Sequence, residues 1–467
     1  MSLMTAPRYV PATATQSPKT SVGELPLSRV AVVLVILVGV LPFGFNLGFP
    51  FEVSPADVVA ILLLPYVAIG ITQTPLFRWF ALIVLASFVV IVAWALWSGT
   101  SAQGPLLSMA FFFKPWVFFF AAYKYVASSP SWQLSALFLL RIAAWAQVVL
   151  LGVIYLAWLD TGFLTVEART ELGLGTTSFT GGVWGRALEL YGYGQVNVTA
   201  GLLSLSIPLF LHRASQCRAF MKLFWLALVP AVWIVILQSG SRGAIVACVT
   251  FLVVALVSRG SSSGTMSYLQ RLVVAIVLAL IFATQGAAIL ALSPKYAKTV
   301  QAIREGQAAD VASGRDRLAW LMLSDLKRSP VVGTGFGDFQ RFHTAKDTMW
   351  VESSPHNTYL GAVHKMGVPI GLSYLLLLLR SVPLYVRSSL RGGSSLGRPL
   401  ALSVAIGLLP FMDALTTPVL GGFILLLFGV MSATGDREGQ LGSDVELGQG
   451  NEVGGVGEKR SLGLAGG

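Results

Sequence analysis

The stretch FRWFALIVLASFVVIVAWALW, residues 77–97, decides the class of fold, because Arg78 is its only charged residue. A helix needs about 20 predominantly apolar residues to cross the hydrocarbon core of a bilayer, and this stretch is long enough. Backbone polar groups inside a bilayer must find hydrogen-bond partners within the protein, and a helix supplies them locally. The stretch therefore predicts a transmembrane helix.

The composition of the whole chain agrees with this prediction. The 467 residues are 55% hydrophobic and 11% charged, with a mean hydropathy of +0.74, whereas soluble domains carry about 25% charged residues. The net charge of +11 does not indicate nucleic-acid binding, because excess Lys and Arg in a membrane protein mark cytoplasmic loops. Cys217 and Cys248 have no metal-ligand spacing, and we expect neither a disulfide nor a catalytic role. The sequence predicts an all-α polytopic integral membrane protein.

Other stretches share the length and hydropathy of residues 77–97. Together they predict about 12 transmembrane helices, at 29–46, 55–73, 77–97, 105–127, 134–158, 195–212, 220–238, 240–258, 270–292, 357–380, 398–413 and 417–433. Arg or Lys lies in or near every second segment that connects two predicted spans, and these segments contain no Asp or Glu. Because an excess of Arg and Lys marks cytoplasmic segments, we expect these segments and both termini to lie in the cytoplasm. We expect residues 1–28 to be a disordered cytoplasmic N-terminus, 29–433 the transmembrane domain, and 434–467 a disordered cytoplasmic tail.

The two long external segments are then 159–194 and 293–356, the second lying between predicted spans nine and ten. Within it, apolar residues recur at helical spacing and predict an amphipathic helix over 315–328, which Ser329-Pro330 ends. The GTGFG sequence at 333–337 lacks the Lys-Ser/Thr of a phosphate-binding loop. We expect its glycines to form a tight turn close to the membrane.

Three residues at external helix ends are candidates for chemistry. They are Arg186 in GRALELYGYGQ, Arg242 in QSGSRGA, and His356 in SSPHNTYLGAVHKMG. An arginine fork suits phosphate, and histidine suits proton transfer near neutral pH. The set indicates an anionic lipid headgroup and a proton transfer at one membrane surface. The alternative is that the arginines are interfacial anchors and that the histidine only starts a helix.

Further candidates lie near these three. Lys114 falls near the middle of the predicted span 105–127, where a charge is costly and is a functional candidate by default. Asn357 follows His356 and can orient its ring or an acceptor. Arg315 is a weaker candidate, because it can instead start the loop helix. His364, two turns beyond His356, is predicted to be a packed or water-contacting residue.

Taken together, these motifs resemble a known family. The sequences SGR…AW…SPVVGTGFGDF and HNTYLGAVHKMG are similar to the carboxy-terminal signature of the bacterial O-antigen ligase and O-antigen polymerase superfamily. Arg186-x-x-x-Leu190 and SRGA at 241–244 are similar to two further signatures of that superfamily. The resemblance covers about residues 30–433.

The resemblance implies a lipid-linked glycan transferase at the periplasmic face of the bacterial inner membrane. Its donor would be a glycan on undecaprenyl pyrophosphate, and its acceptor a lipid A-core sugar for a ligase or another glycan repeat for a polymerase. His356 would be the catalytic base, and Arg186 and Arg242 would bind the diphosphate, with Asn357, Arg315 and Lys114 nearby. The sequence has no Asp-x-Asp, so we expect arginine in place of a metal, and no cofactor. A lipid-glycan transporter is the alternative from another class, although its charged sites would lie nearer the midplane.

Overall fold

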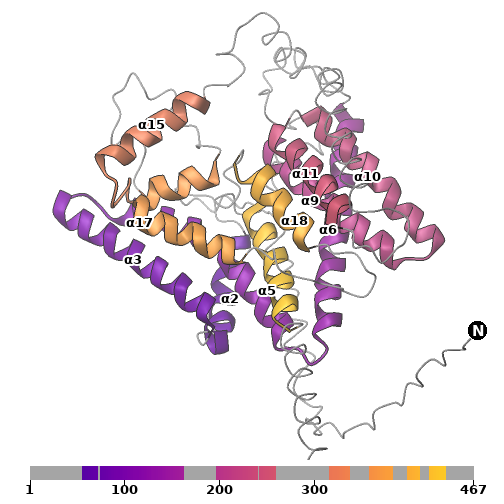
Figure 1. The fold of residues 1–467 in the computed structure, drawn as a ribbon, viewed down its shortest axis with the longest axis horizontal. Helices are drawn as coiled ribbons and strands as arrows, with labels where there is room; N and C mark the ends of the chain where they lie inside the picture. Colours follow the sequence, from indigo (N-terminus) through magenta and orange to yellow (C-terminus); the bar gives the residue numbers. More distant parts are fainter. Residues whose placement is uncertain are drawn as a thin grey trace, which may run out of the picture.

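The computed structural model describes residues 55–71, 74–161, 196–239, 241–258, 315–336, 357–381, 397–410 and 420–437, and its regular structure within them is entirely helical (Figure 1). The all-α prediction is confirmed for these residues. The predicted spans 29–46 and 270–292, both termini, and residues 162–195 of the first external loop lie outside them.

The described helices follow the predicted apolar stretches closely. They are α2 (Pro55–Ile71), α3 (Pro75–Ser98), α4 (Gln103–Phe113), α5 (Pro115–Ala127), α6 (Trp132–Thr161), α9 (Val196–Gln216), α10 (Ala219–Ser239), α11 (Arg242–Ser258), α15 (Arg315–Arg328), α17 (Thr358–Ser381), α18 (Gly397–Ser403), the π-helix η4 (Val404–Leu408) and a last helix, Leu420–Arg437. The predicted helix over 315–328 is confirmed as α15.

Six of the described helices are long and apolar enough to cross a membrane. They are Pro75–Ser98, Gln103–Ala127, Trp132–Leu156, Ala219–Leu237, Thr358–Ser381 and Leu420–Arg437. Shorter apolar helices cover Val58–Ala68, Arg242–Leu256 and Pro399–Leu408, all within predicted spans. The structure therefore supports a multi-pass membrane protein, and the total of 12 spans stays a prediction.

The predicted span 105–127 is bent at Lys114 into α4 and α5. Pro115 explains the bend, because proline has no N–H for the carbonyl of Phe111 and its ring clashes with that carbonyl. Beyond the bend, most of α5 is buried, with Trp116, Phe118 and Phe119 inaccessible to solvent. The last helix packs closely on it, since a Cβ at Gly429 would lie 2.3 Å from the carbonyl oxygen of Phe119.

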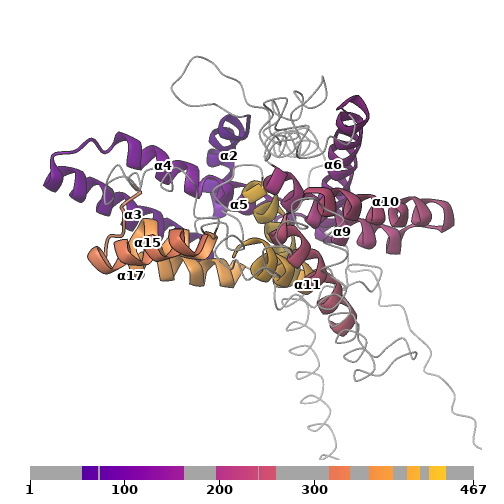
Figure 2. The same ribbon diagram turned by 90° about the horizontal axis from the view of Figure 1, so that it is seen from above.

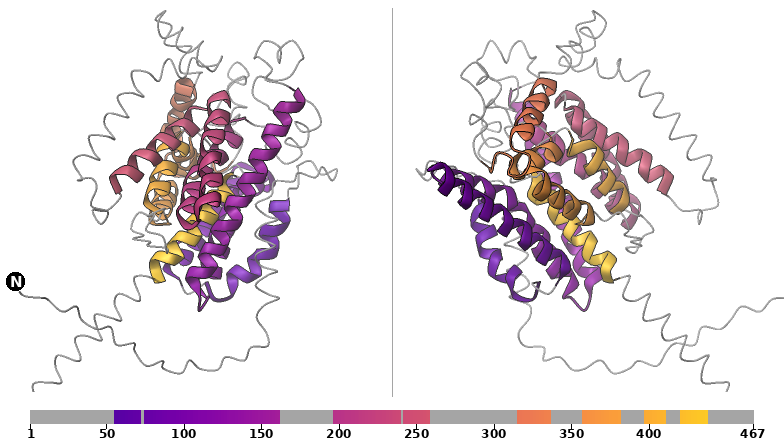
Figure 3. Two further views of the ribbon diagram at one scale, coloured as in Figure 1. Left: turned by 90° about the vertical axis from the view of Figure 1, so that its right-hand side faces the viewer. Right: turned by 60° about the vertical axis from the view of Figure 1, so that its left-hand side comes forward.

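The helices form two groups that meet at α5 and the last helix. Seen from above, α3, α4, α15 and α17 lie on one side, and α9 and α10 lie on the other (Figure 2). Helix α9 is the centre of the second group and packs against α6, α10 and α11. The helices cross at varied angles and do not form one parallel layer (Figure 3).

Candidate functional site

The backbone of α17 breaks at Gly367, which has φ 74° and ψ 170°. Figure 1 shows the ribbon of α17 changing direction within its length. The break removes the regular hydrogen bonds across it. Val368 N donates to Pro330 O at 2.8 Å instead of to His364 O, and Pro369 has no N–H to donate to Lys365 O. Two helix carbonyls therefore need other donors.

Residues 329–336, which we call the docking loop, supply those donors. Thr334 N donates to His364 O at 2.9 Å, and Phe336 N donates to Lys365 O at 3.3 Å. Irregular backbone at membrane depth is tolerated where other protein groups satisfy it. The docking loop thus completes α17 at the break.

Glycines allow the docking loop to come this close to α17. A Cβ at Gly333 would lie 2.3 Å from His364 O, and a Cβ at Gly367 would lie 2.0 Å from Val331 O. Gly333 and Gly335 also have positive φ values of 63° and 59°, a conformation that glycine adopts without steric cost. The predicted tight turn is confirmed, and its glycines serve a backbone-to-backbone contact.

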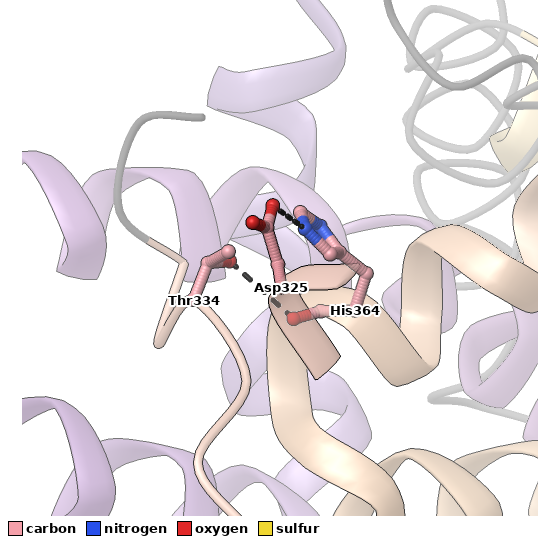
Figure 4. Close-up of polar contacts among 3 residues, drawn as sticks. All are labelled: Asp325, Thr334 and His364. Atoms are coloured by element: carbon pink, nitrogen blue, oxygen red, sulfur yellow. Dashed lines mark hydrogen bonds and ion pairs between the residues drawn. The ribbon is translucent and has the colours of Figure 1, made fainter. Parts of the chain in front are cut away.

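A buried acid–histidine pair lies beside this contact. Asp325 of α15 and His364 of α17 point toward each other in Figure 4, with His364 Nε2 3.0 Å from Asp325 Oδ2. Asp325 is 1% exposed and His364 3% exposed. A ring N–H donates and a carboxylate oxygen accepts, so a His364 ring with its proton on Nε2 donates to Asp325 Oδ2 in this pair. The prediction of a packed His364 is confirmed.

Sequence reasoning missed Asp325, although a signal for it exists. Leu321, Met322 and Leu326 form the buried face of α15, and Asp325 lies on that same face by helical spacing. A carboxylate is rarely buried without a partner. An acidic residue on the apolar face of a loop helix therefore indicates a buried cationic or donor group elsewhere in the chain, here His364.

The beginning of α17 is held by the end of η4. Thr358 N donates to Leu409 O at 2.8 Å, and the Tyr359 hydroxyl donates to Ala405 O at 2.6 Å. Asn357 caps the helix, since its Oδ1 accepts from Leu360 N at 3.0 Å. A helix start joined to another helix end agrees with predicted spans ten and eleven crossing in opposite directions. His356, directly before this cap, lies outside the described residues.

Arg242 begins α11, which packs against η4. A Cβ at Gly407 would lie 2.3 Å from Ala247 Cα, so η4 and α11 are in backbone contact. Ala247 lies five residues after Arg242, about 7.5 Å along a helix axis. The structure therefore places the starts of α11 and α17 beside the same short helix, η4, with Arg242 half-buried.

Residues 224–375, which contain this whole arrangement apart from η4, match the model of the O-antigen ligase family. This segment is similar to the O-antigen ligase family. The resemblance to the superfamily of O-antigen ligases and polymerases is thereby confirmed. A comparison with curated proteins finds no match.

The segment that matches the O-antigen ligase family includes Arg242, Arg315, His356 and Asn357 of the predicted site. Of these, the structure describes the surroundings of Arg242 and Asn357 and the backbone of Arg315, which is the first residue of α15. Arg186 precedes the domain and lies outside the described residues. None of these predicted roles is tested by the structure or the match, so each remains a hypothesis.

Lys114 lies outside the matched segment but near the docking loop. Its side chain is buried at the bend between α4 and α5, with Nζ 5.0 Å from the ring centroid of Phe111. Phe336 of the docking loop packs against Phe112 and Phe113, with ring centroids 5.6 and 6.1 Å apart. The bend at Lys114 and the break at Gly367 are thus joined by one aromatic cluster.

The described residues contain no group of three or more His, Cys, Asp or Glu side chains that could hold a metal ion.

Proposed function

We propose that the chain is an inverting membrane glycosyltransferase of the O-antigen ligase type. It moves a glycan from an undecaprenyl pyrophosphate carrier to a hydroxyl of a lipid A-core sugar at the periplasmic face of the inner membrane. The observation that supports this proposal is the O-antigen ligase match over residues 224–375, which spans both Arg242 and His356. The predicted membrane topology agrees, because it places both residues on the external side.

In the proposed reaction His356 is the general base. Its neutral imidazole accepts the proton of the acceptor hydroxyl while the hydroxyl oxygen attacks the anomeric carbon of the donor sugar. The bond from that carbon to the carrier diphosphate breaks on the opposite face, and the diphosphate leaves with the electron pair. Attack opposite the leaving group inverts the anomeric configuration.

Arg186 and Arg242 bind the carrier diphosphate in this proposal. The start of α11 suits that role, because a helix N-terminus carries partial positive charge and its first N–H groups point outward. An arginine fork there stabilises the charge that develops on the leaving diphosphate. Arg315, Lys114 and Asn357 act as supporting substrate contacts, and the arginines take the place of a metal ion.

The variant His356→Ala tests the proposal in a purified system. With lipid-linked donor and acceptor in detergent, we expect the rate constant for transfer to fall about 10²–10⁴-fold, which is what a general base contributes. Donor binding should be retained, because the base contacts the acceptor. The matched control is His343→Ala, a histidine of the same external loop, which should transfer at the wild-type rate. Wild-type transfer by folded His356→Ala would remove His356 from the mechanism.

A polymerase of the same superfamily is the second candidate, because the family match supports both activities. Glycan profiles of a deletion strain separate the two. Loss of attached glycan together with accumulated carrier-linked chains indicates a ligase, whereas attached single repeats indicate a polymerase. A transporter is contradicted by any new glycosidic bond formed by the purified protein.

A further inference from the structure

Packing of α15 against α17 does not by itself require the hydrogen bond between Asp325 and His364. Apolar side chains already hold the two helices together, with Leu321, Met322 and Leu326 buried on α15. Replacing a buried ionic pair by apolar groups is often neutral or stabilising. What a polar pair adds is direction, because one nitrogen must meet one oxygen at hydrogen-bond distance.

The pair acts on a short segment of helix that is fixed at both ends. Residues 358–366 of α17 lie between the break at Gly367 and the cap at Asn357. Their carboxyl end is bonded to the docking loop through His364 O and Lys365 O, and their amino end to Leu409 O. The rotation of the segment about its axis also depends on side chains that bond to its neighbours, among them Tyr359, whose hydroxyl donates to Ala405 O, and His364. His364 is the buried polar side chain that ties the segment to α15.

We propose that Asp325 and His364 are positioning residues for glycan transfer. Their hydrogen bond helps to set the rotation and depth of residues 358–366, and so the place of the cap residue Asn357, which follows the proposed base His356 in the sequence. From His364 to Asn357 the helix rises about 10 Å, so a small rotation at the pair is carried to the amino end. This inference rests on the proposed role of His356.

The expected consequence is a loss of transfer rate without a loss of donor binding. A displacement of about 1 Å at a reacting group can cost about 10²-fold in rate. We expect Asp325→Leu, which leaves His364 buried without its acceptor, to lower kcat per folded molecule at least 10-fold. The dissociation constant of the lipid-linked donor should change less than 3-fold, because the predicted diphosphate contacts lie on other elements.

Conservative variants guard against a folding defect. Asp325→Asn keeps an amide oxygen that can accept from His364, and His364→Gln keeps a donor near the position of Nε2. Each should retain more of the wild-type kcat than Asp325→Leu, and their double variant should be no worse than the weaker single one. The matched control is Leu326→Ala, which removes packing from the same face of α15. It should lower the unfolding temperature and leave kcat per folded molecule unchanged.

Two outcomes overturn the inference. One is a wild-type kcat per folded molecule in Asp325→Leu or, where that variant does not fold, in His364→Leu, which also lacks the hydrogen bond. The other is a parallel loss of kcat and donor affinity, which would make the pair part of the binding site. Neither outcome bears on His356→Ala, so failure of this inference is distinguishable from failure of the proposed function.

Discussion

Gly367 and Gly333 are single residues on which the contact between the docking loop and α17 depends. Alanine at Gly367 would adopt a φ of 74° and place its Cβ 2.0 Å from Val331 O. A left-handed conformation costs about 1–2 kcal/mol without the clash, so we expect Gly367→Ala to destabilise the protein by at least about 2 kcal/mol. Denaturation in detergent checks this. Gly152→Ala is the control, because a Cβ added at Gly152 would have no atom within 4 Å. It should be neutral or stabilise the helix by up to about 1 kcal/mol. Equal stability of the two variants would contradict the need for glycine at the break.

The sequence was sufficient to predict some of these residues and not others. Pro330 ends α15 and Gly333 allows a tight turn, and both properties are local. Asp325 and His364 are 39 positions apart, and only the folded chain shows that they meet. A Gly-Val-Pro sequence at 367–369 within an apolar stretch indicates a weak point in a helix. It does not indicate which segment repairs the break, because that depends on tertiary packing.

Among the helices, α11 carries the prediction that concerns the diphosphate. Arg242 is its first residue, and a lysine there keeps the charge but loses the two-pronged hydrogen bonding of the guanidinium group. We expect Arg242→Lys to remain impaired, and Arg242→Ala to raise the donor KM, lower kcat, or both. Steady-state kinetics with purified lipid-linked donor measure both constants. Arg218→Ala, on the predicted cytoplasmic side, is the control and should be neutral. Full activity in Arg242→Ala would remove Arg242 from the donor site.

Helix boundaries were predicted well where a single apolar stretch determines them, as for α3 and α6. The helix over 105–127 is divided at Lys114-Pro115, and α17 is broken at Gly367, two residues before Pro369. Pro65, Pro208 and Pro230 lie inside α2, α9 and α10, which are not divided, so an internal proline alone does not predict a break. Hydropathy does not register such breaks, because proline and glycine change backbone geometry with little effect on apolar character. The bends become apparent only when hydrogen-bond partners are followed residue by residue.

For the whole molecule, the alternation of basic segments predicts that 293–356 is external and that the connection holding Cys217 is cytoplasmic. In a variant with Cys248 replaced by Ser, an impermeant maleimide should not label Cys217 in intact cells. A cysteine introduced at Ala308 in the same background, with Cys217 replaced by Ser, should be labelled. Permeabilisation should expose Cys217 and so provides the control. Labelling of Cys217 but not of position 308 in intact cells would reverse the proposed orientation.

The break in α17 also has a consequence for biogenesis. Residues 329–336 leave the ribosome before residues 357–381, so the partner of the break is made first. In the predicted topology it reaches the external side before α17 enters the bilayer. Until the two meet, the carbonyls of His364 and Lys365 have lost their regular helix donors, and an unsatisfied carbonyl in hydrocarbon costs several kcal/mol. Insertion of α17 and docking of residues 329–336 should therefore be coupled. A chain in which α17 has inserted but residues 329–336 have not docked should fold further only slowly and should be degraded readily by membrane proteases.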